Sequence, residues 1–334
     1  MIHIATISQI ASEANVSNTL VSRVLNNKPG VSPVNRARIQ SIIEKHNYVP
    51  NAIARTLVTQ KTSTIGVVME TLLNPFFFDI VKGVQDMAGE MDYNVVFGNG
   101  DNDLGLIMSY LDYFSQGRVD GVIAHYTRTT DHDAFFDIIK RASHYVLIEG
   151  DIPGRIINKV QINNFEGAYR ATEYLIKRGC KNIVHFAGEM KWYCSLERAG
   201  GFTKALNDYS IPTENTLIKV DFLEDKAYKA MKRMIAQNKI PDGCFAAADK
   251  TAFGILRAMH EHGLTAPDDI ALIGFDGDVP DTRSLVFPKL TTMRQPFYEI
   301  GREAIRLLVR SIEDPTAIPV TTVFNAEFVK GDTA

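Results

Sequence analysis

Cysteine is scarce in this sequence, and the few cysteines lie far apart. Cys180, Cys194 and Cys244 are the only three among 334 residues, and no two of them form a C-x-x-C pair. This spacing excludes the disulfide framework of small secreted domains and gives no cysteine-based zinc site. We therefore expect buried free thiols in a reduced, cytoplasmic protein.

Long hydrophobic runs are also missing. No stretch approaches the roughly 18 uninterrupted apolar residues that a membrane-spanning helix needs. The first ten residues, MIHIATISQI, lack a basic segment followed by an apolar one, so they do not resemble a secretory signal. These absences predict a protein that stays in the cytoplasm and has no membrane partner.

Motifs for catalysis, metals and nucleotide cofactors are absent or weak. His260 and His262 are two residues apart, so on a helix they would face different directions and could not share a metal ion. Gly98-Asn99-Gly100 lacks the third glycine and the acidic partner of a dinucleotide site. No Ser, Cys or His lies in a recognisable nucleophile motif. We expect no enzyme, no metal and no cofactor.

The charge that is present is distributed unevenly. The chain carries a net charge of −3, but its first 61 residues contain seven Lys or Arg against two Glu, a net of +5 that leaves −8 for the rest. A small basic segment on a larger acidic body is typical of a phosphate-seeking module attached to a soluble platform. Chance clustering would produce the same numbers, so charge alone does not decide.

The basic segment has the pattern of three short helices between residues 6 and 47. Thr6, Ser17 and Ser32 are residues that favour a helix N-cap, and Pro33 suits the first turn after Ser32. Asn15 tolerates the left-handed conformation of a sharp turn between the first two helices. One face of each helix is apolar at helical spacing. The residues on these faces are Ile7, Ile10, Ala11, Ala14, Val21, Val24, Leu25, Ile39, Ile42 and Ile43.

The second predicted helix, residues 17–26, separates into an apolar and a polar face. Its outward residues are of the kinds that recognise DNA: Asn18 suits adenine, Arg23 suits guanine, and Thr19 and Ser22 suit bases or phosphates. A merely solvated helix face would show a similar pattern. The arrangement of two short helices around a sharp turn nevertheless predicts a helix-turn-helix whose second helix enters a major groove.

From Thr64 onward the pattern changes to alternating strands and helices. Apolar runs of strand length at 65–69, 94–97, 119–124 and 145–148 alternate with helical stretches, and the same alternation resumes at 183–187, 244–247 and 270–273. This order predicts parallel sheets with helices on both faces. Two successive sets of strands indicate an α/β core of two lobes.

An ordered series of motifs over essentially the whole chain resembles the LacI/GalR family of bacterial transcription regulators. The series includes Val16-Ser17, Val21-Ser22-Arg23-Val24-Leu25-Asn26, Val31-Ser32, Tyr48-x-Pro50-Asn51, Ala54-Arg55-x-Leu57, Ile65-Gly66-Val67, Asn74-Pro75-Phe76-Phe77, Asp120-Gly121, Gly201-Phe202, Pro267-x-Asp269-Ile270, Ile273-Gly274-Phe275-Asp276, Leu290-Thr291-Thr292 and Gln295-Pro296.

The resemblance implies a helix-turn-helix headpiece, a hinge helix, and a two-lobed core like that of periplasmic binding proteins. On this basis we expect the headpiece at 1–50 and the hinge helix and linker at 51–63. The N-terminal lobe would comprise 64–162 with 292–324, and the C-terminal lobe 163–291 with 325–334. A homodimer would then bind a near-palindromic operator in double-stranded DNA, because the two-fold symmetry of the protein must be matched in the DNA.

The resemblance also assigns roles in DNA binding. Asn18, Thr19 and Arg23 would read bases. The candidates for phosphate contacts are Thr6, Ser17, Ser22, Asn26, Ser32 and Asn51, and Ala54 and Arg55 belong to the same DNA-binding set. Leu57 matches the hinge leucine that wedges into the minor groove, where an apolar side chain unstacks a base step and bends the duplex. Packing against a partner helix is the other role that Leu57 could fill.

Leu20 departs from the family pattern, which usually has Thr at this position. The change removes a hydroxyl that could contact a phosphate and adds an apolar side chain that could contact a thymine methyl. The prediction of the fold is unaffected, but the bases that this helix recognises need not be those that its relatives recognise.

A small-molecule effector is expected between the lobes, beyond the carboxyl ends of the strands. Glu149, Asp249 and Asp276 directly follow apolar runs, and by family position Arg198 would grip the ligand. Carboxylates and a guanidinium together with aromatic rings suit a sugar, whose hydroxyls need polar partners and whose apolar face needs a ring. The rings that the family position suggests are Phe76, Phe77, Trp192 and Phe222, each of which could instead be a core residue.

Other functions stay open at this stage. The effector could be a purine that acts as a corepressor, or the protein could answer to a phosphorylated carrier protein, as catabolite-control regulators do. The helical stretch Tyr298–Leu308 is compatible with that second possibility. A periplasmic solute-binding protein would share the core, but it would need an export signal and would lack the basic headpiece.

Overall fold

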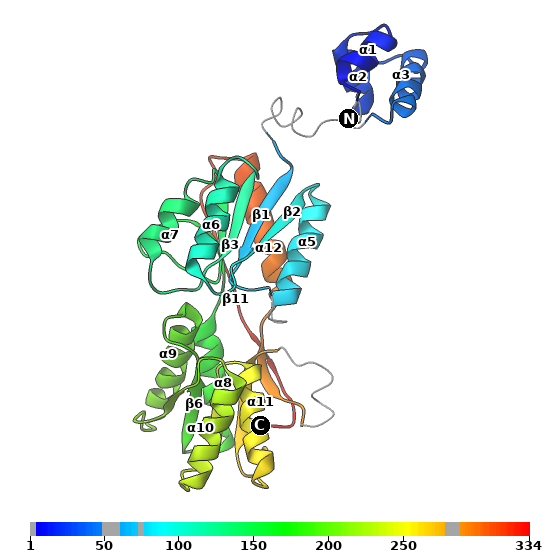
Figure 1. Ribbon diagram of the computed structural model, residues 1–334. Helices are drawn as coiled ribbons and strands as arrows, with labels where there is room; N and C mark the ends of the chain where they lie inside the picture. Colours follow the sequence, from blue (N-terminus) through cyan, green and yellow to red (C-terminus); the bar gives the residue numbers. More distant parts are fainter. Residues whose placement is uncertain (1–4, 49–60, 73–76, 278–287) are drawn as a thin grey trace. The chain divides into compact units, whose positions relative to one another are not determined.

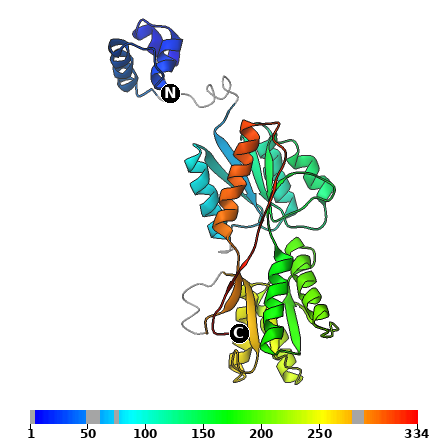
Figure 2. The same ribbon diagram turned by 180° about the vertical axis from the view of Figure 1, so that it is seen from behind.

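The computed structural model describes residues 5–48, 61–72, 77–277 and 288–334, and it divides the chain into two compact units, Met1–Thr62 and Ser63–Ala334. Figures 1 and 2 show the chain from opposite sides. Among the described residues, no helix combines the length and the apolar character that crossing a bilayer requires.

The first unit contains the three predicted helices, α1 (Ile7–Glu13), α2 (Asn18–Leu25) and α3 (Pro33–Lys45). Thr6 caps α1 in a capping box with Gln9, and Ser17 and Ser32 cap the other two helices. Asn15 has a φ of 50°, as the turn between α1 and α2 requires. The three helices enclose a small core of buried residues: Ile10, Ala11, Ala14, Val21, Val24 and Ile39.

The second unit is built on two six-stranded sheets that are nearly all parallel, in agreement with the predicted α/β core. The first sheet has the order β11-β5-β4-β3-β1-β2 and the second β12-β10-β9-β8-β6-β7, and only the β10–β12 pair is antiparallel. The strands of the first sheet are β1 (Thr64–Met69), β2 (Asn94–Asn99), β3 (Gly121–His125), β4 (Tyr145–Ile148), β5 (Asn158–Ile162) and β11 (Thr321–Phe324). Those of the second are β6 (Ile183–Ala187), β7 (Leu217–Lys219), β8 (Gly243–Ala246), β9 (Ala271–Asp276), β10 (Thr291–Arg294) and β12 (Glu327–Val329).

Helices cover both faces of each sheet and so create two apolar cores per lobe. In the N-terminal lobe, α5 (Phe78–Glu90) and α12 (Phe297–Glu313) pack on one face, while α6 (Leu104–Ser115) and α7 (His132–Ile139) pack on the other. In the C-terminal lobe, α10 (Glu224–Ala236) and α11 (Asp249–Glu261) lie opposite α8 (Asn164–Arg178) and α9 (Tyr193–Asp208). Burial on both faces explains why the central strands are continuous apolar runs.

The chain crosses between the two sheets three times. It leaves the first sheet after β5, returns through α12 after β10, and crosses again between β11 and β12. This path corrects one predicted boundary: we expected the N-terminal lobe to resume at residue 292, but β10 pairs with β9 through Arg294 and keeps residues 292–294 in the C-terminal sheet. The parallel hydrogen bonds to β9 hold the chain there until Gln295.

Candidate functional site

The outward face of α2 is the candidate DNA-binding surface of the first unit. Asn18, Thr19 and Arg23 are exposed and Ser22 is half-buried, whereas Val21 and Val24 point into the core. Asn18 Nδ2 donates to Ser8 Oγ at 3.2 Å. The guanidinium of Arg23 makes no hydrogen bond to any other residue that the structure describes. A forked donor without an internal partner is suited to an external acceptor such as a guanine edge.

Three of the predicted phosphate-contacting hydroxyls lie at the N-termini of the three helices. Thr6, Ser17 and Ser32 each accept from a backbone amide of the first turn, all three at 3.3 Å. An accepted bond leaves the hydroxyl hydrogens of Ser17 and Ser32 available to donate, whereas the Thr6 hydroxyl already donates to Gln9 Oε1 at 3.3 Å. Helix N-termini also attract anions. Asn26 is engaged differently, because it ends α2 and its Nδ2 donates to the carbonyl oxygen of Ser22 at 2.8 Å.

Leu20 is half-buried and packs against the apolar core of the first unit. The side chain that replaces the usual Thr therefore contributes to packing, and only part of it faces outward. The other predicted DNA-binding residues, Asn51, Ala54, Arg55 and Leu57, lie outside the described residues.

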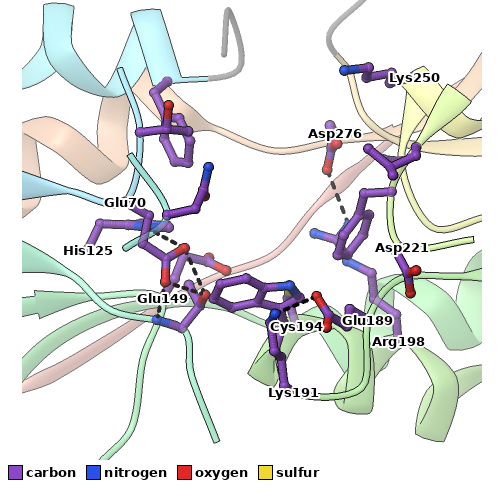
Figure 3. Close-up of a pocket in the computed structure, with 18 of the residues that line it drawn as sticks. Glu70, His125, Glu149, Glu189, Lys191, Cys194, Arg198, Asp221, Lys250 and Asp276 are labelled. Carbon is purple, nitrogen blue, oxygen red and sulfur yellow. Dashed lines mark hydrogen bonds and ion pairs between the residues drawn. The ribbon is translucent and has the colours of Figure 1, made fainter. Parts of the chain in front are cut away.

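The second unit contains a cavity of about 780 Å³ at the carboxyl ends of the strands of both sheets (Figure 3). Its size is ordinary for a pocket that encloses a small molecule. Six of the eight predicted effector residues line it: Phe77, Glu149, Trp192, Arg198, Phe222 and Asp276. Phe76, the eighth residue of the predicted set, is not among the described residues.

Arg198 is the centre of a hydrogen-bond network on the side of the cavity that the C-terminal lobe forms. It reaches the cavity from the first turns of α9 and is 3% exposed. Its Nε donates to Asn164 Oδ1 at 2.8 Å, its Nη1 donates to the carbonyl oxygen of Ala247 and lies 3.3 Å from Asp276 Oδ1, and its plane stacks on Phe275. Gln295 Nε2 also donates to Asp276 Oδ1, at 2.7 Å. Such a connected network fixes each side chain in one orientation before any ligand arrives.

Asp249 is the predicted effector residue that does not line the cavity. It is fully buried at the start of α11, where Oδ1 accepts from Thr292 Oγ1 at 2.6 Å and Oδ2 accepts from the backbone N of Gly277 at 2.9 Å. The carboxylate is directed under the ends of β9 and β10 because both donors lie there. Its role in the structure is to join those strands, so the prediction of a ligand contact was wrong for this residue.

Backbone strain is concentrated at the strand ends that line the cavity. Glu149 has a φ of 68°, Asp276 of 111°, and Asp221 and Phe222 of 54° and 60°. These residues carry side chains in a region that favours glycine, at an energetic cost of order 1–3 kcal/mol each. The turns that result direct the carboxylates and the Phe222 ring away from the strand direction and toward the cavity.

The walls of the cavity also include the rings of Phe77 and Trp192 and two backbone hydrogen bonds between the lobes. Phe77 is 6% exposed and lies edge-on to the His125 ring with a centroid distance of 4.9 Å, whereas its neighbour Phe78 is 59% exposed. Trp192 lies in the loop before α9, where Thr129 N donates to Lys191 O at 2.9 Å and Tyr193 N donates to Thr127 O at 2.6 Å. These two bonds join the lobes directly beside the cavity.

The side of the cavity that the N-terminal lobe forms contains three polar residues that were not predicted from the sequence: Glu70, His125 and Thr127. Thr127 Oγ1 lies 3.1 Å from both oxygens of Glu70, and His125 Nδ1 lies 3.5 Å from Glu70 Oε2 (Figure 3). All three are at most 6% exposed. Glu70 and His125 end β1 and β3, so the rule that selected Glu149, a polar residue at the end of an apolar run, would have found them too.

Charged side chains at the rim were likewise not predicted. Glu189 pairs with Lys191 at 2.8 Å and Asp221 pairs with Lys226, while Asp101 and Lys250 are exposed. Exposed pairs of this kind contribute little to stability, so they shape the electrostatic potential at the entrance more than they hold it together. Lys226 and Lys250 lie in the first turns of α10 and α11 and the others lie in short connections, where a charged residue gives no signal of its own.

Burial changes the protonation of two lining groups. It raises the pKa of the Glu149 carboxyl, which the charges of His125 and Arg198 offset only in part. It also raises the pKa of Cys194 to about 12, so this residue stays a neutral thiol at physiological pH. Within the described ranges, no group of three His, Cys, Asp or Glu is placed to hold a metal ion.

Comparisons with known protein families match both units. Residues 6–51 match the model of the bacterial regulatory proteins of the lacI family, and residues 172–334 match a periplasmic binding protein-like domain. The match at 6–51 contains the three helices of the first unit, and the match at 172–334 contains all six strands of the second sheet together with the lining residues from Glu189 to Asp276.

Two curated relatives cover nearly the whole chain. The ribose operon repressor of Halalkalibacterium halodurans is 33% identical over 312 residues, which are 92% of this chain and 90% of that protein. Catabolite control protein A of Priestia megaterium is 30% identical over 314 residues, 93% of each. Both relatives are similar to this chain in the headpiece and in the core.

Solved structures agree on the fold. The crystal structure of the Lac repressor dimer bound to operator and the anti-inducer ONPF matches with a TM-score of 0.87 at 23% identity, over 99% of each chain. The headpiece, the two-lobed core and the near-complete coverage by the curated relatives lead to one conclusion. The chain belongs to the lacI family of bacterial regulatory proteins, as a DNA-binding transcription regulator with a ligand-binding core.

Proposed function

We propose that the protein is a homodimeric repressor whose affinity for a near-palindromic operator is switched by a sugar bound in the cavity of the core. One observation carries this proposal: a single chain combines the exposed polar face of α2 with a cavity of about 780 Å³ lined by rings and buried charges. The Lac repressor, whose fold this chain shares, is a dimer on its operator.

The proposed DNA contacts follow from the geometry of α1 to α3 for residues 6–32, and from the family resemblance for residues 51–57. Asn18, Thr19 and Arg23 read base edges from the exposed face of α2, and the outward part of Leu20 contacts a thymine methyl. The capping hydroxyls of Thr6, Ser17 and Ser32 donate to phosphates, as do Ser22, Asn26 and Asn51. Ala54, Arg55 and Leu57 form the hinge contacts, with Leu57 as the wedge in the minor groove.

The proposed sugar contacts follow from the chemistry of the cavity. Arg198 and Asp276 present a donor and an acceptor that are already fixed by their neighbours, which suits adjacent hydroxyls. Phe77, Trp192 and Phe222 provide flat apolar surfaces for the C–H face of a sugar ring. The ribose operon repressor, one third identical to this chain, is named for a sugar operon.

The proposed switch is a change in the angle between the lobes. A ligand that contacts Glu149 on one lobe and Arg198 on the other favours whichever angle brings both within reach, and it shifts the equilibrium by the difference in affinity. The backbone bonds from Thr129 to Lys191 O and from Tyr193 to Thr127 O lie at the same inter-lobe edge, so they must adapt when that angle changes.

A regulator that answers to a phosphorylated carrier protein would need accessible polar groups on α12. This helix contains residues 298–308, the stretch whose sequence is compatible with such a regulator. In the structure Tyr298 Oη donates to Asp86 Oδ2 at 3.0 Å, and Arg302 forms a two-pronged pair with Glu90 at 2.8 and 2.9 Å. These groups are engaged with α5 of the same lobe. We therefore favour the cavity as the place where the regulatory signal is received.

Two experiments test the proposed function. In the first, binding to genomic fragments is measured at several salt concentrations. We expect a specific fragment whose affinity falls steeply with salt, because phosphate contacts release counterions. In the second, thermal shifts are measured with a panel of sugars and nucleobases, and we expect a sugar to raise the melting temperature. No specific fragment, or stabilisation by nucleobases alone, would contradict the proposal.

A further inference from the structure

The carboxylates that line the cavity differ in whether an Arg, Lys or His side chain lies within ion-pair distance of them. Asp276 lies 3.3 Å from the Arg198 guanidinium, and Glu70 lies 3.5 Å from His125 Nδ1. At the rim, Glu189 and Asp221 each pair with a lysine. Glu149 has no such partner: among the described residues, no Lys, Arg or His lies within ion-pair distance of its carboxylate.

Glu149 also keeps one oxygen without a hydrogen-bond donor in standard geometry. The carboxylate receives a backbone hydrogen bond from Ile162 and a long bond of 3.5 Å from Asn164 Nδ2 to Oε2, both from uncharged donors, and Oε1 is buried with no hydrogen-bond partner of standard geometry among the described residues. The residue is only 6% exposed and lines the cavity, and His125 Nδ1 beside it is likewise without a hydrogen bond. A buried polar atom that lacks a partner costs free energy, and more so when the group is charged, so both atoms indicate a missing ligand group.

The carboxylate of Glu149 is the acceptor, and it determines the chemistry of the ligand group that would bind there. A carboxylate in a dry site is best compensated by a cation that also donates a hydrogen bond, because the charge and the desolvated oxygen are then satisfied together. Within the cavity the fixed cation, Arg198, is already committed to Asp276, Asn164 and Ala247 O and cannot serve Glu149. Figure 3 shows Glu149 at the Glu70 and His125 end, apart from the Arg198 end.

We infer that the effector is an amino sugar whose protonated amine binds the carboxylate of Glu149 while its hydroxyls bind at Arg198 and Asp276. This inference rests on the proposed sugar site and adds the charge of the ligand to it. The ammonium donates to Glu149, and the carboxylate of Glu70, which accepts from Thr127 Oγ1 at 3.1 Å, lies at the same end of the cavity. A neutral sugar fills the same space but leaves the Glu149 charge uncompensated.

The test uses the full chain and isothermal titration with matched sugars. D-Glucosamine, D-galactosamine and D-mannosamine are each compared with the parent hexose, which differs only by a hydroxyl in place of the amine, and with the N-acetyl derivative, which keeps the nitrogen but loses the charge. For at least one of the three pairs we expect the amino sugar to bind about tenfold to a hundredfold tighter than both of its neutral counterparts.

Two variants assign the effect to its residue. In Glu149→Gln the shape is retained and the charge is lost, so the ratio of amino-sugar to hexose affinity should fall close to one. Glu173→Gln is the matched control: it makes the same change on α8, at a residue that does not line the cavity and whose carboxylate pairs with Lys177 at 2.9 Å, and the ratio should stay as in the natural chain. Circular dichroism and operator binding verify that both variants are folded.

Each result is decisive. A hexose or N-acetyl sugar that binds as tightly as its amine overturns the inference but supports the proposed sugar site. A preference for the amine that survives in Glu149→Gln also overturns it, because another group then recognises the charge. If no sugar of either kind binds at millimolar concentration, the proposed function itself fails and the inference falls with it.

Discussion

The two recognition surfaces of this protein are built on opposite principles. On α2 the polar side chains are exposed, and the Arg23 guanidinium has no hydrogen-bond partner among the described residues. In the cavity the polar side chains are buried, and Arg198 is bonded to Asn164, Asp276 and a backbone carbonyl. The difference teaches that substitutions on the first surface change binding alone, whereas substitutions on the second change binding and stability together.

The largest effect is expected for Arg198→Ala. The variant leaves Asp276 buried without its guanidinium, and breaking a buried ion pair from one side destabilises a protein by about 3–5 kcal/mol. The ratio of operator affinities with and without a bound sugar should also fall to one. Urea unfolding followed through Trp192, the single tryptophan, measures the first effect, and operator titrations measure the second.

Arg257→Ala is the matched control for this prediction. Its guanidinium pairs with Glu224 and Asp225 at the surface and is 37% exposed, so its removal should change the stability by less than about 1 kcal/mol. A loss in Arg257→Ala equal to that in Arg198→Ala would remove the contrast between buried and exposed charge. A normal sugar response in Arg198→Ala would show that the cavity is not the effector site.

The second prediction concerns the pH dependence of stability and the buried residue His185. His185 is fully buried, its ring is stacked on Phe245, and burial lowers its pKa from 6.5 to about 4. The unfolded chain therefore binds the proton more readily than the folded one. The stability that neutral His185 contributes is complete above pH 6.5 and is lost as the pH falls toward 4, by about 3 kcal/mol in total.

Replacement of this residue by a ring that does not titrate tests the assignment. His185→Phe should flatten the decrease in the urea midpoint between pH 6.5 and pH 4, measured through Trp192. His260→Gln, a change at an exposed histidine of α11, should keep the slope of the natural chain. An unchanged slope in His185→Phe would mean that other titratable groups govern the acid transition.

The third prediction addresses the exposed surface. Arg23→Ala should weaken binding to the best genomic fragment by about 1–3 kcal/mol and relax specificity at one base position, as expected for the loss of a bidentate base contact. Urea unfolding should be unchanged because the guanidinium has no internal bond to lose. Lys45→Ala provides the control: its ammonium is exposed and pairs with Glu13, and we expect only a small change in operator affinity. A weakening of the same size in Lys45→Ala would indicate a general charge effect.

Local signals in the sequence were sufficient for the first unit. Thr6, Ser17 and Ser32-Pro33 mark the helix starts through contacts within one turn, so four consecutive residues contain the whole interaction. The strands at 145–148 and 183–187 were equally readable, because burial on both faces makes them apolar apart from Tyr145 and the buried His185. Short strands with polar residues, such as β7 and β12, gave no such signal.

The cavity was predicted less completely because its residues meet only in three dimensions. Glu149 and Asp276 were found by their place after a strand, and the same rule applied to β1 and β3 would have given Glu70 and His125. Asp249 shows the limit of that rule. It too follows a strand, but the donors that decide its direction, Gly277 N and Thr292 Oγ1, are more than 25 residues away in the sequence.

The smallest expected effect separates the two roles that Ser17 combines. As a helix cap it accepts from Leu20 N at 3.3 Å, and Ser17→Ala should cost about 1 kcal/mol of local stability, seen as faster hydrogen exchange in residues 17–26 of the full chain. Ser17→Asp keeps a capping oxygen but places a negative charge where a phosphate is proposed to bind. It should therefore exchange as slowly as the natural chain and yet bind the operator more weakly than Ser17→Ala does. The opposite order, with Ser17→Asp binding at least as well, would mean that Ser17 caps α2 without touching DNA, and the phosphate contact would have to be reassigned to the other helix starts.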